Sequence, residues 1–222
     1  MKRILCFITL LYFTACTQVT HKEGAAIADS LNQIPKTNIL ELSEEILNQI
    51  KNYYYNEYGK GSRKEEVQTD STIEISFYNL PKNKADYDGF LMTITLAKRD
   101  SNLLYNAVPM LLGDMNNDKQ NDLLVNAHTE GGGTGGNGIW WNDLFVFFNE
   151  NGKYKLASVN KDMDLIDCND GHFLMQKIEN GFLLGHASCY AKEDALCCPS
   201  LNYIVQTKLL NHKLVFVGKS EK

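Results

Sequence analysis

The sequence has neither a basic cluster nor a long apolar run, and each absence argues against a class of partner or anchor. Its 22 Lys and Arg residues are outnumbered by 27 Asp and Glu residues, which gives a formal net charge of −5. Such a chain offers no positive patch, which argues against nucleic acid as a partner and against attraction to anionic lipid. The apolar run at residues 4–13 is far shorter than the roughly 20 residues of a membrane-spanning helix.

Several motifs of enzymes and cofactor sites are also missing. The glycine-rich segment 131–138 has neither the Lys-Ser/Thr pair of a P-loop nor a GxGxxG turn opening a helix, which argues against phosphate binding. The cysteines lack the CxxC spacing of a zinc site, and no histidine stands beside a cysteine as in thiol enzymes. Because no catalytic constellation stands out, the sequence favours a protein that binds over one that catalyses.

The N-terminus has the pattern of an export signal. Lys2 and Arg3 precede the apolar run 4–13, and small residues follow it. The segment Phe13–Cys16 resembles the lipobox of bacterial lipoproteins, with Phe13 in place of the usual Leu. This resemblance implies cleavage before Cys16 and lipidation of that cysteine, which would anchor the protein to a membrane.

This N-terminus leads to a prediction of location and of domain organisation. We expect a signal peptide at 1–15, a lipidated polar tether at 16–38 and one folded domain at 39–222. Removal of the signal, with its two positive charges, would leave a net charge of −7 (−5 − 2). We expect the mature protein in the cell envelope of a bacterium, either periplasmic or exposed at the surface.

The apolar periodicity of the folded part predicts an α+β class. Residues 39–58 carry apolar positions three and four apart, which indicates an N-terminal amphipathic helix that starts near Ser43 and stops at Gly59. Short alternating segments follow, and Asn149–Gly152 and Glu179–Gly181 have the composition of hairpin turns. We therefore expect the helix to precede a mainly antiparallel, strand-rich domain. The predicted strands include 72–77, 90–96, 108–112, 122–128, 143–148, 154–159, 172–178, 182–187, 203–210 and 214–217.

Four cysteines follow the lipobox, and an exported protein meets an oxidising compartment. Three pairings are possible, and one of them joins the neighbours Cys197 and Cys198, which is strained because bonded cysteines prefer Cα atoms about 5.5 Å apart. We therefore predict that one of these neighbours pairs with Cys189 and the other with Cys168.

One loop has the chemistry of a cation site. Oxygen-bearing side chains alternate along residues 114–122, and Ca²⁺ takes six to eight oxygen ligands. The alternative is a metal-free hairpin in which the same side chains cap the turn backbone. We predict a calcium ion in a structural role, held by the side chains of Asp114, Asn116, Asp118 and Asp122 and by the backbone carbonyl of Gln120.

The loop resembles the calcium loop of integrin-type FG-GAP and VCBS repeats, Gly-Asp-x-Asn-x-Asp-Gly-x-x-Asp-Leu. The match begins at Gly113 and ends at Leu123, with Lys119 in place of the usual glycine. A single copy cannot build the propeller of those families, so the resemblance implies the loop alone. With the glycine-rich segment, the aromatic strand 140–148 and Cys-Cys-Pro-Ser at 197–200, the loop also resembles a broad group of exported bacterial lipoproteins of unassigned function.

The neighbouring residues Trp140 and Trp141 are the candidate ligand contacts. Side chains alternate along a strand, so one indole should pack inward while the other can reach a glycan or a protein partner. The sequence therefore favours a non-enzymatic binding or interaction module. One alternative is an envelope hydrolase acting on glycan or peptidoglycan, with Glu130 and Asp143 as its acids, and His128 beside Glu130 could assist acid–base chemistry. The other alternative is a periplasmic inhibitor of another enzyme.

Overall fold

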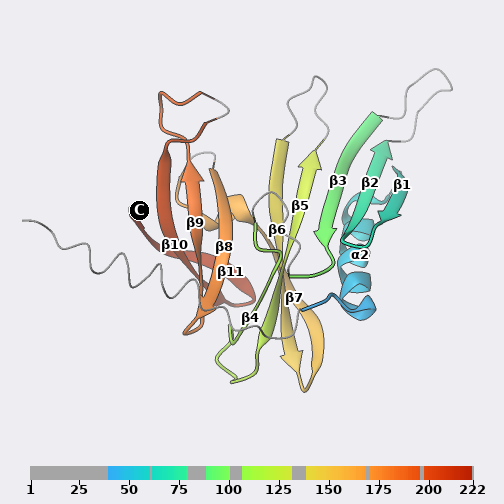
Figure 1. Ribbon diagram of the computed structural model, residues 1–222, viewed down its shortest axis with the longest axis horizontal. Coiled ribbons are helices and arrows are strands. Elements are labelled where there is room, and N and C mark those ends of the chain that lie inside the picture. The colour runs from blue at the N-terminus through green and yellow to red at the C-terminus, as the bar shows by residue number, and fades with distance from the viewer. Residues whose placement is uncertain are drawn as a thin grey trace, which may run out of the picture. The chain divides into compact units, whose positions relative to one another are not determined.

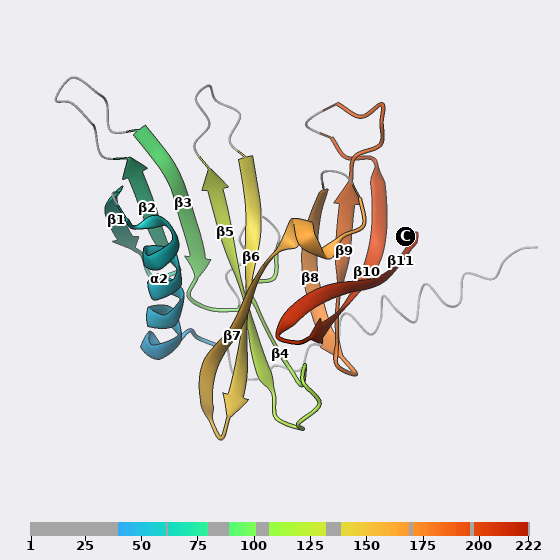
Figure 2. The same ribbon diagram turned by 180° about the vertical axis from the view of Figure 1, so that it is seen from behind.

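The computed structural model describes residues 40–60, 62–79, 89–100, 107–131, 139–168, 171–195 and 198–221. These residues form one helix, one short 3-10 turn and eleven strands (Figures 1 and 2). In chain order the elements are α2 (Glu44–Tyr58), β1 (Ser62–Gln68), β2 (Thr72–Asn79), β3 (Gly89–Ala97), β4 (Met110–Gly113), β5 (Asp122–Gly131), β6 (Ile139–Glu150), β7 (Lys153–Lys161), η1 (Asp162–Leu165), β8 (Gly171–Glu179), β9 (Phe182–Cys189), β10 (Leu201–Leu210) and β11 (Lys213–Glu221).

The strands form two antiparallel sheets. The larger sheet has the order β1-β2-β3-β5-β6-β7. Strand β4 pairs with the first residues of β5, and β3 pairs with the later ones. The smaller sheet has the order β11-β10-β9-β8. Type I′ turns, which need positive φ at both central residues, suit the hairpins of such sheets. The turns at Asn151-Gly152 and Asn180-Gly181 have this conformation, as the sequence predicts, and Asn211-His212 adds a third.

The helix α2 begins and ends where its capping residues predict. The Ser43 side chain accepts a hydrogen bond from the backbone N–H of Ile46, and Glu44 and Glu45 lie in the positive first turn. At the other end the N–H of Gly59 bonds to the carbonyl of Tyr55. A Cβ atom on Gly59 would lie 2.4 Å from that oxygen, so only glycine fits there.

The predicted α+β class is wrong, because the described residues are mostly antiparallel sheet. The helix is also shorter than the apolar spacing over 39–58, because it forms from Glu44 after its cap at Ser43, and the N–H of Leu42 bonds to the carbonyl of Lys98, the residue after β3. The physical reason lies in the packing. The smaller sheet packs on one face of the central strands of the larger sheet, and α2 packs on the opposite face, so the helix does not form half of the fold.

The central strands β5 and β6 are buried on both faces. Alternate residues of β5, such as Leu123 and Val125, pack with α2 and strands β2 and β3 in one core. Leu124 and, on β6, Leu144 point the other way into a second core shared with the smaller sheet. The smaller sheet contributes Phe173, Met175, Leu183, Ala187, Cys189, Val205 and Leu214 to this second core.

The disulfide pairing differs from the predicted one. Cys168 bonds to Cys189, with Cα atoms 6.0 Å apart. The register of β8 and β9 places Gly171 opposite Cys189, which brings Cys168, three residues earlier, beside it. This register cannot be read from cysteine spacing, and it overturns the prediction that each of these cysteines pairs with Cys197 or Cys198. Cys198 is exposed, and Cys197 lies outside the described residues.

Candidate functional site

The predicted calcium loop lies between β4 and β5, and its side chains bind its own backbone. The Asp114 carboxylate accepts hydrogen bonds from the backbone N–H groups of Asp118 (3.1 Å) and Lys119 (2.9 Å). The Asn116 side chain also accepts from Asp118 N–H (2.9 Å), and Asp118 in turn accepts from the N–H of Gln120 (2.7 Å). These bonds hold the loop, including Lys119 at a φ of 70°, in the manner of Asx turns.

Asp122 joins this loop to the neighbouring hairpin. Its carboxylate is fully buried and accepts hydrogen bonds from the backbone N–H groups of Met115 (2.9 Å) and Asn149 (3.1 Å). Burial raises the pKa of Asp122, and the two hydrogen bonds partly oppose that shift. The Gln120 side chain accepts a further hydrogen bond from the N–H of Asn151 in the same hairpin (3.3 Å).

The five predicted calcium ligands share one loop, and the side-chain oxygens of Asp114 and Asn116 meet at the backbone N–H of Asp118. Within the described ranges, no group of three or more His, Cys, Asp or Glu side chains is placed to hold a metal ion. The oxygen donors are of the type that Ca²⁺ prefers. However, both oxygens of Asp114 and of Asp122 already accept backbone N–H groups. Calcium binding thus stays a prediction.

The two tryptophans of β6 point to opposite faces of the larger sheet, as strand alternation predicts. Trp141 is only 9% exposed and belongs to the core beneath α2, whereas Trp140 is 38% exposed. Because Trp140 is the accessible indole of the pair, it is the better placed of the two to contact a ligand.

A buried polar cluster surrounds Asp143 on the face that carries Trp141. One oxygen of Asp143, Oδ2, accepts hydrogen bonds from the Tyr54 hydroxyl (2.8 Å), Trp141 Nε1 (3.1 Å) and the Thr129 hydroxyl (3.1 Å). Burial raises the pKa of Asp143, and these hydrogen bonds oppose that shift. Burial also raises the pKa of Tyr54 well above its usual value. Sequence reasoning missed this cluster because Tyr54 comes from α2, 89 residues before Asp143.

A second polar group lies on the opposite face, and we call it the Trp140 cluster. The indole of Trp140 lies flat against the imidazole of His172, with ring centroids 3.4 Å apart and planes 12° apart. The His128 ring is 5.5 Å away and tilted by 39°. The members of the cluster come from β5, β6, η1 and β8, and they are His128, Glu130, Trp140, Asn142, Asp162 and His172.

Hydrogen bonds order the buried part of the Trp140 cluster. The backbone N–H and the side-chain Nδ2 of Asn142 both donate to the Asp162 carboxylate at 3.0 Å. The remaining side-chain atom of Asn142, Oδ1, can only accept, so the facing Nδ1 of His128 (3.3 Å) donates to it. The other ring nitrogen of His128 lies 3.3 Å from Glu130 Oε1, and His172 Nδ1 lies 3.4 Å from Asp162 Oδ2.

The structure does not bring together the two acids of the hydrolase hypothesis. Glu130 lies on the Trp140 face of the larger sheet, with its side chain half exposed, whereas Asp143 is buried on the other face. Two carboxylates on opposite faces of a sheet cannot flank one scissile bond. Asp162 belongs to the Trp140 cluster, whereas the nearby acids Asp164 and Asp167 are exposed and Asp170 lies outside the described residues.

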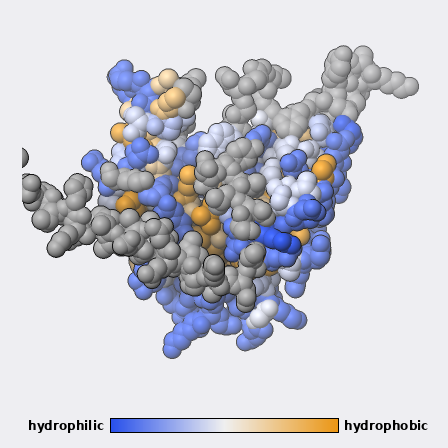
Figure 3. All heavy atoms as spheres, in the orientation of Figure 1, coloured by the Kyte–Doolittle hydropathy of each residue, from blue (hydrophilic) through white to orange (hydrophobic). Residues whose placement is uncertain are grey.

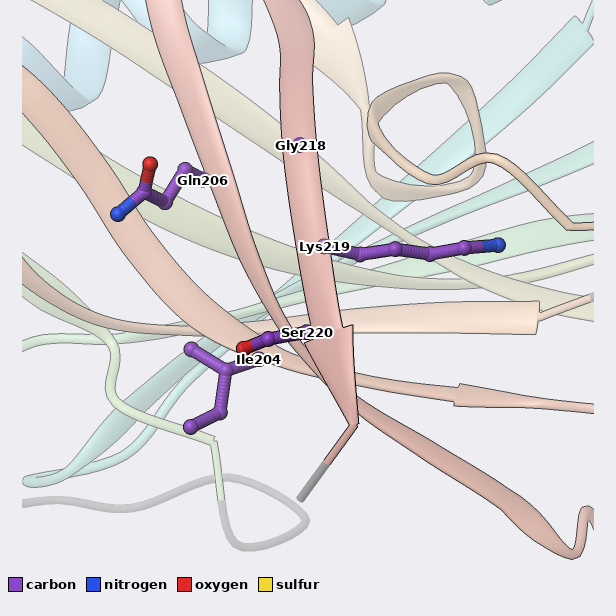
Figure 4. A pocket seen from close by; sticks show the side chains of 5 residues that line it. All are labelled: Ile204, Gln206, Gly218, Lys219 and Ser220. Carbon is purple, nitrogen blue, oxygen red and sulfur yellow. The ribbon is translucent and has the colours of Figure 1, made fainter.

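The described part of the surface carries a further hollow, on the smaller sheet. In the view of Figure 3 the described residues are mostly hydrophilic, with apolar residues between them. This hollow on β10 and β11 has a volume of about 220 Å³. Figure 4 shows residues that line it, among them Ile204, Gln206 and Gly218. Lys219 also lines it but points to the other side of the strands, where its ammonium bonds to the carbonyl of Asp167 (2.6 Å). The hollow therefore gathers no charged groups.

Comparison with known proteins gives no relative for this chain. No family model, no curated protein and no solved structure matches it. Among the described residues, no helix is long and apolar enough to cross a membrane. The Trp140 cluster is the candidate functional site because it joins an accessible indole to ordered polar groups.

Proposed function

We propose that the protein is a lipoprotein of the bacterial cell envelope, anchored through Cys16, whose folded domain binds a glycan without catalysing a reaction. The N-terminal pattern of basic, apolar and small residues before Cys16 supports the anchor. The observation that carries the binding function is Trp140, a partly exposed indole with one face stacked on the ring of His172.

The groups around Trp140 favour a sugar as the ligand. Sugar rings carry C–H faces that pack on aromatic rings and hydroxyl groups that exchange hydrogen bonds with carboxylates and imidazoles. Glu130 lies directly opposite Trp140 in the register of β5 and β6, and half of its side chain is exposed. Because the indole sits on a strand, the backbone that carries it is already ordered before a ligand binds.

The anchor is tested by metabolic labelling with a radioactive fatty acid in a bacterial host. We expect the full chain to take up label and the Cys16→Ser variant to lose it. Cys6→Ser is the matched control, because Cys6 lies inside the apolar run and not at its end. Undiminished labelling of the Cys16→Ser variant would contradict the lipoprotein assignment.

The binding function is tested by sedimentation of the purified full chain with peptidoglycan sacculi. Truncation of an anchoring tryptophan typically costs 2 kcal/mol or more, so Trp140→Ala should lower the affinity by roughly tenfold or more. Val67→Ala, which removes an exposed apolar side chain on the edge strand β1, should bind like the wild type. Equal binding by both variants, or no sedimentation of the wild type, would count against this proposal.

A further inference from the structure

His172 connects the smaller sheet to the Trp140 cluster. It belongs to β8, yet its ring covers a face of Trp140 on β6 and its Nδ1 lies 3.4 Å from Asp162 Oδ2 in η1. That nitrogen is buried and makes no hydrogen bond to any described residue. The contact with Asp162 is therefore close enough for an ion pair but is not a directed hydrogen bond, and its strength depends on the charge of the imidazole.

Two groups that attract a cation lie against the ring of His172, namely the carboxylate of Asp162 and the indole of Trp140. Asp162 accepts hydrogen bonds from Asn142 and from the backbone N–H of Met163, so it acts as a carboxylate acceptor. A cation on His172 would face this carboxylate and, at the same time, the π system of Trp140. The next strand, β9, places the uncharged Ser188 opposite His172.

The other charged groups near the two indoles are His128, Glu130 and Lys161. On β5, His128 lies 5.5 Å from the indole, and the carboxylate of Glu130 lies beside that imidazole at 3.3 Å. The ammonium of Lys161 lies over the ring of Trp141, which points to the opposite face of the sheet.

We propose that Trp140 is a proton-gated contact, in which protonation of His172 holds the indole against the smaller sheet and reduces its availability to a ligand. Histidine is the side chain whose charge ordinarily changes between about pH 5 and 8. An imidazolium adds a cation–π attraction to the existing stack and an ion pair with Asp162. The effect on ligand binding rests on the function proposed above, whereas the proton response of the indole does not.

The gate is tested first by the intrinsic fluorescence of the full chain, without any ligand. An imidazolium in contact with an indole accepts an electron from its excited state far better than a neutral imidazole does. We expect emission to fall as the pH is lowered from 8 to 5. His172→Phe keeps an aromatic ring on Trp140 but removes the charge, so this fall should disappear.

Further variants decide which residues produce the fluorescence response. Trp140→Phe reports on Trp141 alone and should lack the His172-dependent component. His128→Gln should retain it, because His128 is not the stacked ring. His172→Gln replaces the phenylalanine variant if that one does not fold. An unchanged response in the His172 variants, or its persistence in Trp140→Phe, would overturn the proposal.

Sedimentation with sacculi at pH 5.5 and 7.5 then measures the effect on binding. A cation–π interaction at a partly exposed site corresponds to about a two- to fivefold change in affinity, so the wild type should bind that much more weakly at pH 5.5. His172→Phe should bind equally at both values. If the fluorescence responds to pH but the protein does not bind sacculi, the proposed function is refuted and the proton response of Trp140 stands. If the protein binds sacculi through Trp140 but shows no fluorescence response, only the proton-gated contact is refuted.

Discussion

Replacing the buried carboxylate of Asp143 separates the contribution of its hydrogen bonds from the cost of its charge. Asp143→Asn retains an oxygen that can accept from Tyr54, Thr129 and Trp141. Asp143→Leu has a similar shape but removes the acceptor. In the wild type, three buried donors bond to one oxygen of Asp143. The asparagine variant keeps an acceptor for these donors, whereas the leucine variant does not.

The leucine variant should be strongly destabilised. The hydroxyls of Tyr54 and Thr129 lie 3.5 Å apart and can bond to each other, whereas the N–H of Trp141 would lose its acceptor. A buried donor without an acceptor costs about 1–3 kcal/mol, so one or two of them cost roughly 2–4 kcal/mol. For a domain of this size that loss lowers the melting temperature by roughly 5–15 °C.

The asparagine variant should change the pH dependence more than the stability itself. Burial raises the pKa of Asp143, so the folded state binds its proton more tightly than the unfolded state. The stability of the wild type therefore falls as the pH rises from the unfolded pKa, about 3.9, through the higher folded pKa. Asp143→Asn removes this dependence, so its stability relative to the wild type should improve as the pH rises through that window.

Urea unfolding followed by circular dichroism, at several values between pH 4 and 7.5, measures both effects. We expect the asparagine variant to stay within about 1 kcal/mol of the wild type and the leucine variant to lose several times more. If Asp143→Leu unfolded at the same urea concentration as the wild type, Asp143 would not be the acceptor that holds this cluster. If the asparagine and wild-type curves ran parallel with pH, the pKa shift argued here would be refuted.

Three further predictions concern the loop, a turn and the disulfide. If the loop 114–122 binds calcium, about 1 mM Ca²⁺ should raise the melting temperature by several degrees over EDTA or Mg²⁺, and Asp118→Ala should abolish the increase; no increase would leave the loop an Asx-rich turn. Gly152→Ala should lower the free energy of unfolding in urea by about 1 kcal/mol, because the φ of Gly152 is +87°. Gly218 has open space around it and no positive φ, so Gly218→Ala should leave the free energy of unfolding unchanged. Equal effects of the two substitutions would refute the strain argument. Cys189→Ala opens a disulfide whose cysteines are 21 positions apart and should cost about 3 kcal/mol under oxidising conditions, a difference that a reducing agent should erase; a difference that survives reduction would point to packing instead.

Local features of the fold could be predicted because a few neighbouring residues determine them. Ser43 and Gly59 bound the helix, and Asn-Gly pairs mark two of the hairpin turns. The alternation of Trp140 and Trp141 follows from the pleat of a strand alone. Each of these features depends on residues only a few positions apart.

The fold class and the site depend on distant partners, which is why they could not be predicted. The continuous apolar run around Leu123–Val125 does indicate a strand buried on both faces, but it does not say what covers each face. The disulfide follows from the register of β8 with β9. The Trp140 cluster needs His172, which comes 32 positions after Trp140 from another sheet and carries no signal of its own in the sequence.

The placement of β5 has a consequence for how the domain comes apart. This strand pairs with β3, β4 and β6, and its side chains enter both cores. Neither sheet can therefore lose its core while the other keeps a complete one, and the two sheets form a single cooperative unit. The amide protons of β5 should exchange with solvent only when the whole domain unfolds, whereas those of the exposed edge strand β1 exchange through local opening.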